Sequence, residues 1–223
     1  MVLSSNFKHE PTGRELVLEI EKRLPEYISG SRLEHTYSCR DEALAIARIM
    51  GVEEKYMSDV EASALLHDLT KHMPLEEHMR LCEKFGIEAG KHVTTALLHS
   101  KTAAYLAREL FEINDVVFSA IFHHTTGKED MGLLDKIIFL ADYTEKTRKY
   151  EHSHLTREFF YERAQKNEEK IKMAALDKAI VMSIDNTIAH LMQSASIIDE
   201  QTVKTRNFIL KRQKEQTYIF EKE

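Results

Sequence analysis

The chain has 223 residues, of which 43% are hydrophobic and 30% are charged, and its formal net charge is −6 at pH 7. Seven glycines and three prolines are few for a turn-rich all-β protein, and no apolar stretch is long enough to cross a membrane. The length and composition predict one folded domain that does not enter a membrane. Because the net charge is negative, we also do not expect the protein to bind nucleic acid.

The expected elements are helices from one end of the chain to the other, because apolar residues recur at intervals of three and four. We expect Thr12 to cap the first helix and Ser58 the third, with Gly51 and Gly86 ending the second and fourth. No alternating segment is long enough for a strand. The expected helices cover residues 12–28, 32–50, 58–73, 75–85, 94–113, 114–124, 130–146, 156–193 with a charged turn near 166–170, and 199–216. The sequence therefore predicts a single all-α helical bundle.

The cysteine content predicts a reducing compartment. Cys39 and Cys82 are too few for a disulfide scaffold, and both occur within helical patterns. Residues 1–16 contain no hydrophobic signal region. We therefore predict a cytoplasmic protein.

Histidines and carboxylates interrupt several of the apolar runs. His67 and Asp68 directly follow Leu65 and Leu66, and a buried carboxylate costs several kcal/mol unless it is paired or bound to metal. Asp142 lies on the apolar stripe of its own helix. Side chains that converge from several helices of a bundle can build a metal site. The candidates are His35, His67, Asp68, His99, His124 and Asp142. Taken singly, each also fits a satisfied core residue or an ion-pair partner.

The order of these residues resembles the H…HD…D signature of the HD phosphohydrolase superfamily. The segments "RLEHT", "ALLHDLTK", "LLHSKTAAYLA", "HTTGK", "LLDKIIFLADYTEKTR" and "LDKAIVMSIDNT" look like the YqeK-type symmetrical diadenosine tetraphosphate hydrolases, a binuclear, iron-using branch. The resemblance covers roughly residues 14–212. It implies an HD-type helical bundle over 1–223, with an HD core at about 30–150 and C-terminal helices at about 155–217 packing on it.

The resemblance also implies two metal ions. His35, His67, Asp68 and Asp142 match the ligands of the first, and His99 and His124 match ligands of the second, with Asp68 bridging both. The implied cofactor is a pair of divalent or mixed-valence transition-metal ions, with iron expected first and manganese or zinc as alternatives. A carboxylate can bridge two ions about 3.5–4 Å apart, and a water shared by them would become the nucleophile near neutral pH.

The chain departs from the family pattern at two places. His123 stands where relatives carry an aromatic residue before "HTTG", and "HSKT" replaces a glycine and a proline after the histidine. Adjacent residues on a helix point about 100° apart, so His123 and His124 are not expected to reach the same ion. We assign His124 as the ligand and leave the role of His123 open.

Cationic and polar groups near these motifs are candidates for binding phosphate. Asp68 and Lys71 are the expected catalytic residues, since Lys71 follows the HD pair by one helical turn and matches the superfamily's lysine. Each cation, taken alone, also fits ordinary surface charge. The substrate-binding candidates are Arg32, Lys71, Thr125, Thr126, Gly127 and Arg148.

The resemblance implies symmetrical hydrolysis of diadenosine tetraphosphate to two ADP. Two alternatives stay open: another nucleotide phosphomonoesterase or cyclic-nucleotide phosphodiesterase, and a non-catalytic HD module that senses nucleotides. The expected partner is a dinucleoside polyphosphate or another nucleotide, and a homodimer is compatible with the sequence.

Overall fold

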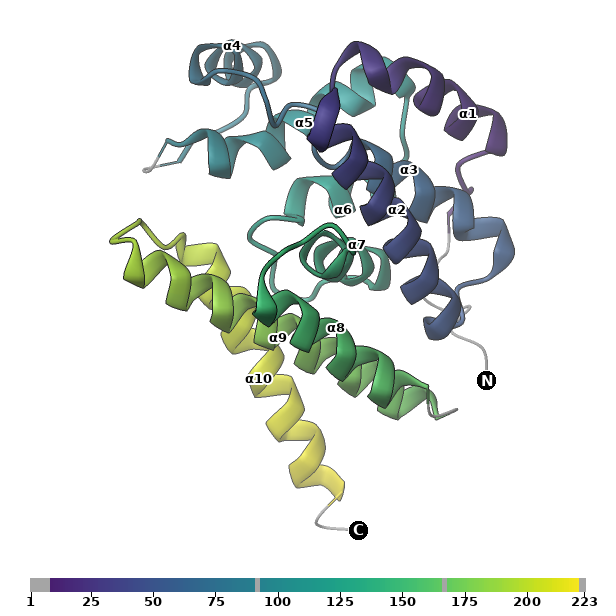
Figure 1. Cartoon of the computed structure of the whole chain (residues 1–223), viewed down its shortest axis with the longest axis vertical. Coiled ribbons are helices and arrows are strands. Elements are labelled where there is room, and N and C mark those ends of the chain that lie inside the picture. Colours follow the sequence, from purple (N-terminus) through teal and green to yellow (C-terminus); the bar gives the residue numbers. More distant parts are fainter. Residues whose placement is uncertain (1–8, 91–92, 166–167, 221–223) are drawn as a thin grey trace.

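The computed structural model describes residues 9–90, 93–165 and 168–220, and of residues 215–220 only the backbone. Every regular element in these ranges is helical, which confirms the predicted all-α class (Figure 1). The α-helices are α1 Arg14–Arg23, α2 Gly30–Met50, α3 Met57–Leu66, α4 Leu75–Phe85, α5 Thr95–Phe111, α6 Asp115–His123, α7 Leu133–Thr144, α8 Glu151–Ala164, α9 Glu169–Gln193 and α10 Glu200–Phe220. Short 3₁₀ turns at Leu24–Glu26 and Glu54–Tyr56 precede α2 and α3.

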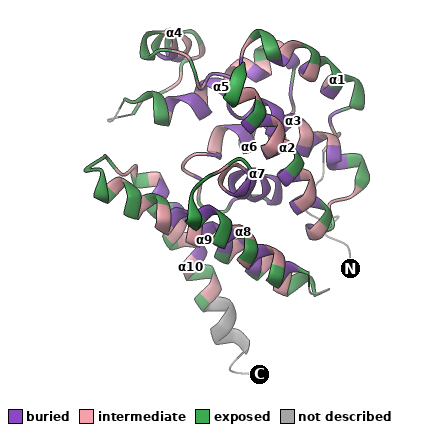
Figure 2. Cartoon of the chain, viewed as in Figure 1, coloured by how far each residue is buried: buried purple, intermediate pink, exposed green. Residues whose placement is uncertain are grey.

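The helices surround α7, which is buried along most of its length. α2 packs on α3 and α7, and α6 packs on α3, α5 and α7. α8 and α9 run side by side below α7, and α10 continues from α9 (Figure 1). Buried residues lie on the helix faces that turn toward this interior, and exposed residues lie on the outer faces (Figure 2). Leu66, Ile137 and Phe160 are fully buried, and each such side chain contributes about 1.5–3 kcal/mol of hydrophobic free energy.

Two of the predicted helix caps are wrong. The N-cap of α1 is Gly13, while the backbone N–H of Thr12 donates to Asp59 Oδ1 at 2.8 Å. α3 begins at Met57, directly after the 3₁₀ turn, so Ser58 lies inside the helix and donates its hydroxyl to the Thr12 carbonyl. Both residues join α1 to α3. The predicted glycine ends are confirmed, because Gly51 and Gly86 both have left-handed backbone conformations.

The third helix ends earlier than predicted, at Leu66 and not before Pro74. The ring Nδ1 of His67 lies 2.7 Å from the Ala64 carbonyl and donates to it, and the Asp68 N–H would use that carbonyl if the helix continued. Residues 67–73 form tight turns whose backbone bonds span three residues, such as Lys71 N–H to the Asp68 carbonyl at 3.0 Å. The HD pair therefore lies just beyond the helix.

The C-terminal helices pack on the rest of the chain. α9 contacts α2, α7, α8 and α10. α9 and α10 are joined at residues 194–199. The predicted charged turn near 166–170 includes residues 166–167, which lie outside the described ranges. The division into a core at 30–150 and an appended helical part remains a prediction. Among the described residues, no helix combines the length and apolarity that a bilayer crossing requires.

Candidate active site

The six predicted metal ligands converge at the centre of the fold. They come from α2, the ends of α3 and α6, α5 and α7, and all except Asp142 are buried. Among the described residues, three groups of three place one ligand atom each within 4.8 Å of one another. These groups are His35, His67 and Asp68; His67, His124 and Asp142; and Asp68, His99 and His124.

Asp68 lies between two sets of histidines. Its Oδ2 is 3.7 Å from His35 Nε2 and 3.5 Å from His67 Nε2. Its Oδ1 is 3.3 Å from His99 Nε2 and 3.6 Å from His124 Nε2. Each oxygen of one carboxylate thus faces its own pair of imidazoles, which is the arrangement that a ligand shared by two cations requires.

Asp142 closes the first set. Its Oδ1 lies 3.0 Å from His35 Nε2 and 3.8 Å from His67 Nε2. Arg148 donates to the same oxygen and to the Asp142 carbonyl, the latter at 2.9 Å. Burial opposes ionisation of Asp142, but the positive charge of Arg148 and the neighbouring His35 ring hold its pKa well below the usual value.

The outer ring nitrogens of His67 and His124 donate to backbone carbonyls away from the cluster. His67 Nδ1 donates to the Ala64 carbonyl and His124 Nδ1 to the Ile121 carbonyl, both at 2.7 Å. If the helices continued, the N–H groups of Asp68 and Thr125 would donate to these same two carbonyls. Each histidine contact therefore ends its helix and also fixes the orientation of the imidazole ring. Protons on Nδ1 leave Nε2 as a lone pair directed at the cluster, as in a metal-ligating histidine.

Several cluster atoms lack a hydrogen-bond partner. Within the described part of the chain these include His35 Nε2, His67 Nε2 and Asp68 Oδ1, all buried. Because buried polar atoms in folded proteins are almost always paired, such a group of unpaired ligand atoms requires an explanation. Imidazole nitrogens and carboxylate oxygens suit transition metals such as zinc, manganese and iron. The residues therefore fit a metal centre.

The charge states of the cluster also favour cations. Burial alone would raise the pKa of Asp68, but interactions with His67, His124 and His99 hold it well below its usual value. Burial lowers the pKa of His99 to about 4, and the positive charge of Lys71 acts in the same direction. Burial likewise lowers the pKa of His124. An ionised carboxylate beside neutral imidazoles such as those of His99 and His124 is the form that binds metal.

Glu145 is a member of the site that the sequence did not single out. It is fully buried, and its Oε1 accepts from His35 Nδ1 at 3.0 Å and from Thr147 Oγ1 at 2.7 Å. Burial opposes its ionisation, but hydrogen bonds from His35, Ser38 and Thr147 lower its pKa to about 2. The sequence feature that could have identified Glu145 is its position three residues after Asp142. A glutamate at that spacing is common on any helix surface, so it does not stand out.

The predicted cations lie at three places around the cluster. Arg32 donates to Asp68 Oδ2 at 2.6 Å. Lys71 Nζ is 3.7 Å from Asp68 Oδ1 and 3.0 Å from His99 Nε2, and its side chain remains one-third exposed. Arg148 holds Asp142 as described above.

A pocket of about 340 Å³ opens beside the cluster, and we call it the nucleotide pocket after the ligand that the family resemblance predicts. One wall includes Lys71, His124, Thr125 and Arg148. The other wall comes from α8 and α9, where the sequence motifs predicted no site residue. These two helices contribute His152, Ser153, Ser183, Asn186, Thr187 and His190 to the pocket.

Thr126 and Gly127 lie outside the nucleotide pocket, although the sequence placed them with Thr125 at the phosphates. The Gly127 N–H already donates to the His123 carbonyl at 2.8 Å. A Cβ at Gly127, whose φ is 68°, would come within 2.5 Å of Thr205 Cγ2, so its Cα faces α10. Thr126 lines a different pocket. Of the predicted hydroxyl and backbone donors, only Thr125 is at the cluster, with Oγ1 3.2 Å from His99 Nε2.

Residues 32–147 match the model of the HD domain family. The chain belongs to the HD superfamily. It is also 32% identical over 193 residues to the symmetrical bis(5'-nucleosyl)-tetraphosphatase of Halalkalibacterium halodurans, covering 84% of this chain and 94% of that protein. The enzyme of the same name from Bacillus subtilis is 28% identical over 82% of this chain and 91% of its own length. These matches confirm the resemblance to the symmetrical tetraphosphatases.

A solved structure shares the fold. The crystal structure of a predicted HD superfamily hydrolase involved in NAD metabolism from Clostridium acetobutylicum matches with a TM-score of 0.74 and 26% identity, over 91% of this chain and 99% of that one. The HD-type bundle is thereby confirmed. The HD domain match begins in α2 and ends just after α7, so it contains all six predicted ligands, while α8 and α9 supply the far wall of the nucleotide pocket.

Proposed function

We propose that this HD-domain protein hydrolyses diadenosine tetraphosphate symmetrically, giving two ADP. The observation that carries the proposal is the position of Asp68, with each carboxylate oxygen facing a separate pair of histidines. The names of its relatives supply the substrate class and the position of cleavage. Metal-dependent hydrolysis of a phosphoanhydride fits this arrangement.

The metal centre is the first part of the proposal. His35, His67, Asp68 and Asp142 would hold one ion, and Asp68, His99 and His124 the other. Such ions supply Lewis acidity and an activated water at neutral pH. We propose iron as the natural metal, with manganese and zinc as the alternatives that this donor set also accepts.

The chain's own cations act on the phosphates. Lys71 reaches from the cluster into the nucleotide pocket, so its ammonium can donate to a phosphate oxygen beside Asp68. Arg148 holds Asp142 in place and presents the rest of its guanidinium to the same pocket. Negative charge that develops on the phosphate oxygens during attack is stabilised by such fixed positive groups. Lys71 is accordingly our proposed catalytic cation.

The nucleotide pocket would hold one nucleoside. Its α9 wall offers the amide of Asn186 and the hydroxyls of Ser183 and Thr187, which can bind a base edge or ribose. Both cysteines are free and buried, which supports our placement of the protein in the reducing cytoplasm. A homodimer remains a prediction.

The test is product analysis in isotope-labelled water. Chain loaded with iron, and separately with manganese or zinc, is incubated with diadenosine tetraphosphate, other nucleotide phosphoesters and cyclic nucleotides. We expect ADP as the sole nucleotide product, with label in its terminal phosphate. ATP with AMP would contradict symmetrical cleavage, and turnover of only a phosphomonoester or a cyclic nucleotide would favour the other hydrolase class. Binding without turnover for every metal would favour a sensing module.

A further inference from the structure

The proposed substrate is symmetric, but the site is not. Attack at a central phosphorus leaves one ADP unit on each side of the bond that breaks, so the two units must contact different residues. The nucleotide pocket measures about 340 Å³, near the low end of the roughly 300–1,000 Å³ typical of small-molecule sites. It accommodates one nucleoside with its phosphates, and the other unit needs a second place.

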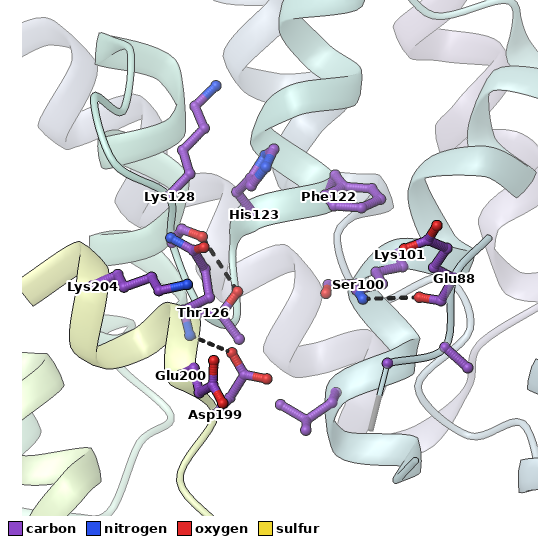
Figure 3. A pocket seen from close by; sticks show the side chains of 15 residues that line it. Glu88, Ser100, Lys101, Phe122, His123, Thr126, Lys128, Asp199, Glu200 and Lys204 are labelled. Carbon is purple, nitrogen blue, oxygen red and sulfur yellow. Dashed lines mark hydrogen bonds between the residues drawn. The ribbon is translucent and has the colours of Figure 1, made fainter. Parts of the chain in front are cut away.

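A second pocket of about 530 Å³ lies on the other side of the segment that follows α6. It is bounded by α5, the end of α6 and the start of α10 (Figure 3). His124 and Thr125 line the nucleotide pocket, while their neighbours His123 and Thr126 line this second pocket. Consecutive Cα atoms are about 3.8 Å apart, so residues that line one pocket are direct neighbours in the chain of residues that line the other. A phosphate chain held at the cluster would cross only this segment to reach the second pocket.

The second pocket carries the groups that a nucleoside diphosphate needs. The ammonium groups of Lys101 and Lys204 stand on opposite walls, and Asp199 and Glu200 lie beside Lys204 (Figure 3). Lysine binds phosphate as a point charge, and carboxylates accept from ribose hydroxyls. The half-buried ring of Phe122 stacks on Phe118, and its exposed part offers a base an apolar contact. The mixture of both charges fits a nucleotide better than an inorganic anion.

His123 completes this set. Its Nδ1 lies 2.9 Å from the Ser119 carbonyl, and a carbonyl only accepts, so Nδ1 carries the proton. The other ring nitrogen, Nε2, is therefore an acceptor at the pocket, suited to an amino group of a base or to a ribose hydroxyl. His123 thus faces the second pocket while His124 faces the cluster.

We infer that the second pocket binds the second nucleoside diphosphate unit of the substrate, which makes it a specificity site for dinucleotides. The inference rests on the proposed function. In the reaction, water adds to one central phosphorus, the central P–O–P bridge breaks, and the departing oxygen belongs to the other ADP. One ADP leaves from each pocket.

The test separates dinucleotide binding from binding of a single nucleotide. Lys204 is exposed on α10, so Lys204→Glu does not disturb the core. We expect KM for diadenosine tetraphosphate to rise about tenfold, equivalent to about 1.4 kcal/mol, because an attractive charge becomes repulsive. The inhibition constant of ADP should change less than twofold, because ADP can still bind in the nucleotide pocket, which the substitution leaves intact. Lys204→Arg should retain the wild-type KM within about twofold.

Lys178→Glu is the matched control, an identical charge change at an exposed lysine of α9 that lines neither pocket. It should leave KM and the ADP inhibition constant unchanged. An unchanged KM in Lys204→Glu would overturn the inference, as would an equal rise in both constants or a KM rise of the same size in Lys178→Glu. Failure of the wild-type chain to form ADP from the dinucleotide would instead refute the proposed function, and the inference with it.

Discussion

Replacing Glu145 with glutamine should weaken the metal centre without changing any proposed ligand. Glu145 accepts hydrogen bonds from His35 Nδ1, from Ser38, from Thr147 Oγ1 and from the Thr147 N–H, the last at 2.6 Å. A glutamine of the same shape brings an NH₂ group, which must face one of these donors. If it faces Thr147, two donors oppose each other. If it faces His35, the imidazole proton shifts to Nε2 and the lone pair directed at the cluster is lost.

The magnitude follows from this conflict. A buried donor left without an acceptor costs about 1–3 kcal/mol. Loss of the partner that orients a ligating histidine typically lowers metal affinity about 10–100-fold, or about 1.4–2.8 kcal/mol. The two free-energy ranges overlap because they describe the same conflict. His35 either keeps the Nδ1 proton opposite the new NH₂ group, or moves that proton to Nε2 and loses the lone pair that would bind the metal. We therefore expect a 10–100-fold higher dissociation constant for the ion held by His35.

The assay is anaerobic metal titration of the apo chain against a competing chelator. Asp59→Asn is the matched control, because Asp59 is also a fully buried acceptor, bonded to the Thr12 N–H at 2.8 Å and to Asn114 at 2.9 Å, but lies outside the cluster. It should lower unfolding free energy by about 1–3 kcal/mol and leave metal affinity intact. Metal affinity within twofold of wild type in Glu145→Gln would refute the reasoning, as would an equal loss in Asp59→Asn.

Three further outcomes are expected. Asp68→Ala should remove most of both metal ions, since its two oxygens face both histidine sets, and elemental analysis finding two ions per chain would contradict the shared ligand. His124→Ala should lose metal and nearly all turnover, while His123→Ala should keep its metal and show only a defect in substrate binding. Metal analysis of both variants in parallel tests this, and the reverse result would make His123 the ligand. Lys71→Met should lower kcat by about tenfold to a thousandfold, with ADP still the sole nucleotide product, and an unchanged kcat would return Lys71 to ordinary surface charge.

Local rules predicted the helices well. Apolar residues at three- and four-residue intervals define each helix, and glycine ends α2 and α4 because it adopts positive φ without steric cost. The candidate ligands could also be predicted from the sequence. Polar residues such as Asp68 and Asp142 interrupt apolar runs, and a carboxylate at such a buried position needs a hydrogen-bonding partner or a cation to offset the cost of burial. Their placement as metal ligands remains a prediction, although the structure brings all six together.

Contacts between distant residues decided the rest. The sequence alone determined the helical class, the order of the helices and the residues that a metal centre would draw from them, since each depends on neighbours within one or two turns. Only the tertiary structure placed Glu145 on His35, 110 residues away, and α9 across the nucleotide pocket. It also turned Gly127 toward Thr205 and outside the nucleotide pocket. Such contacts follow from how whole helices pack, and helix packing depends on the shape of every side chain in the interface, which no local pattern records.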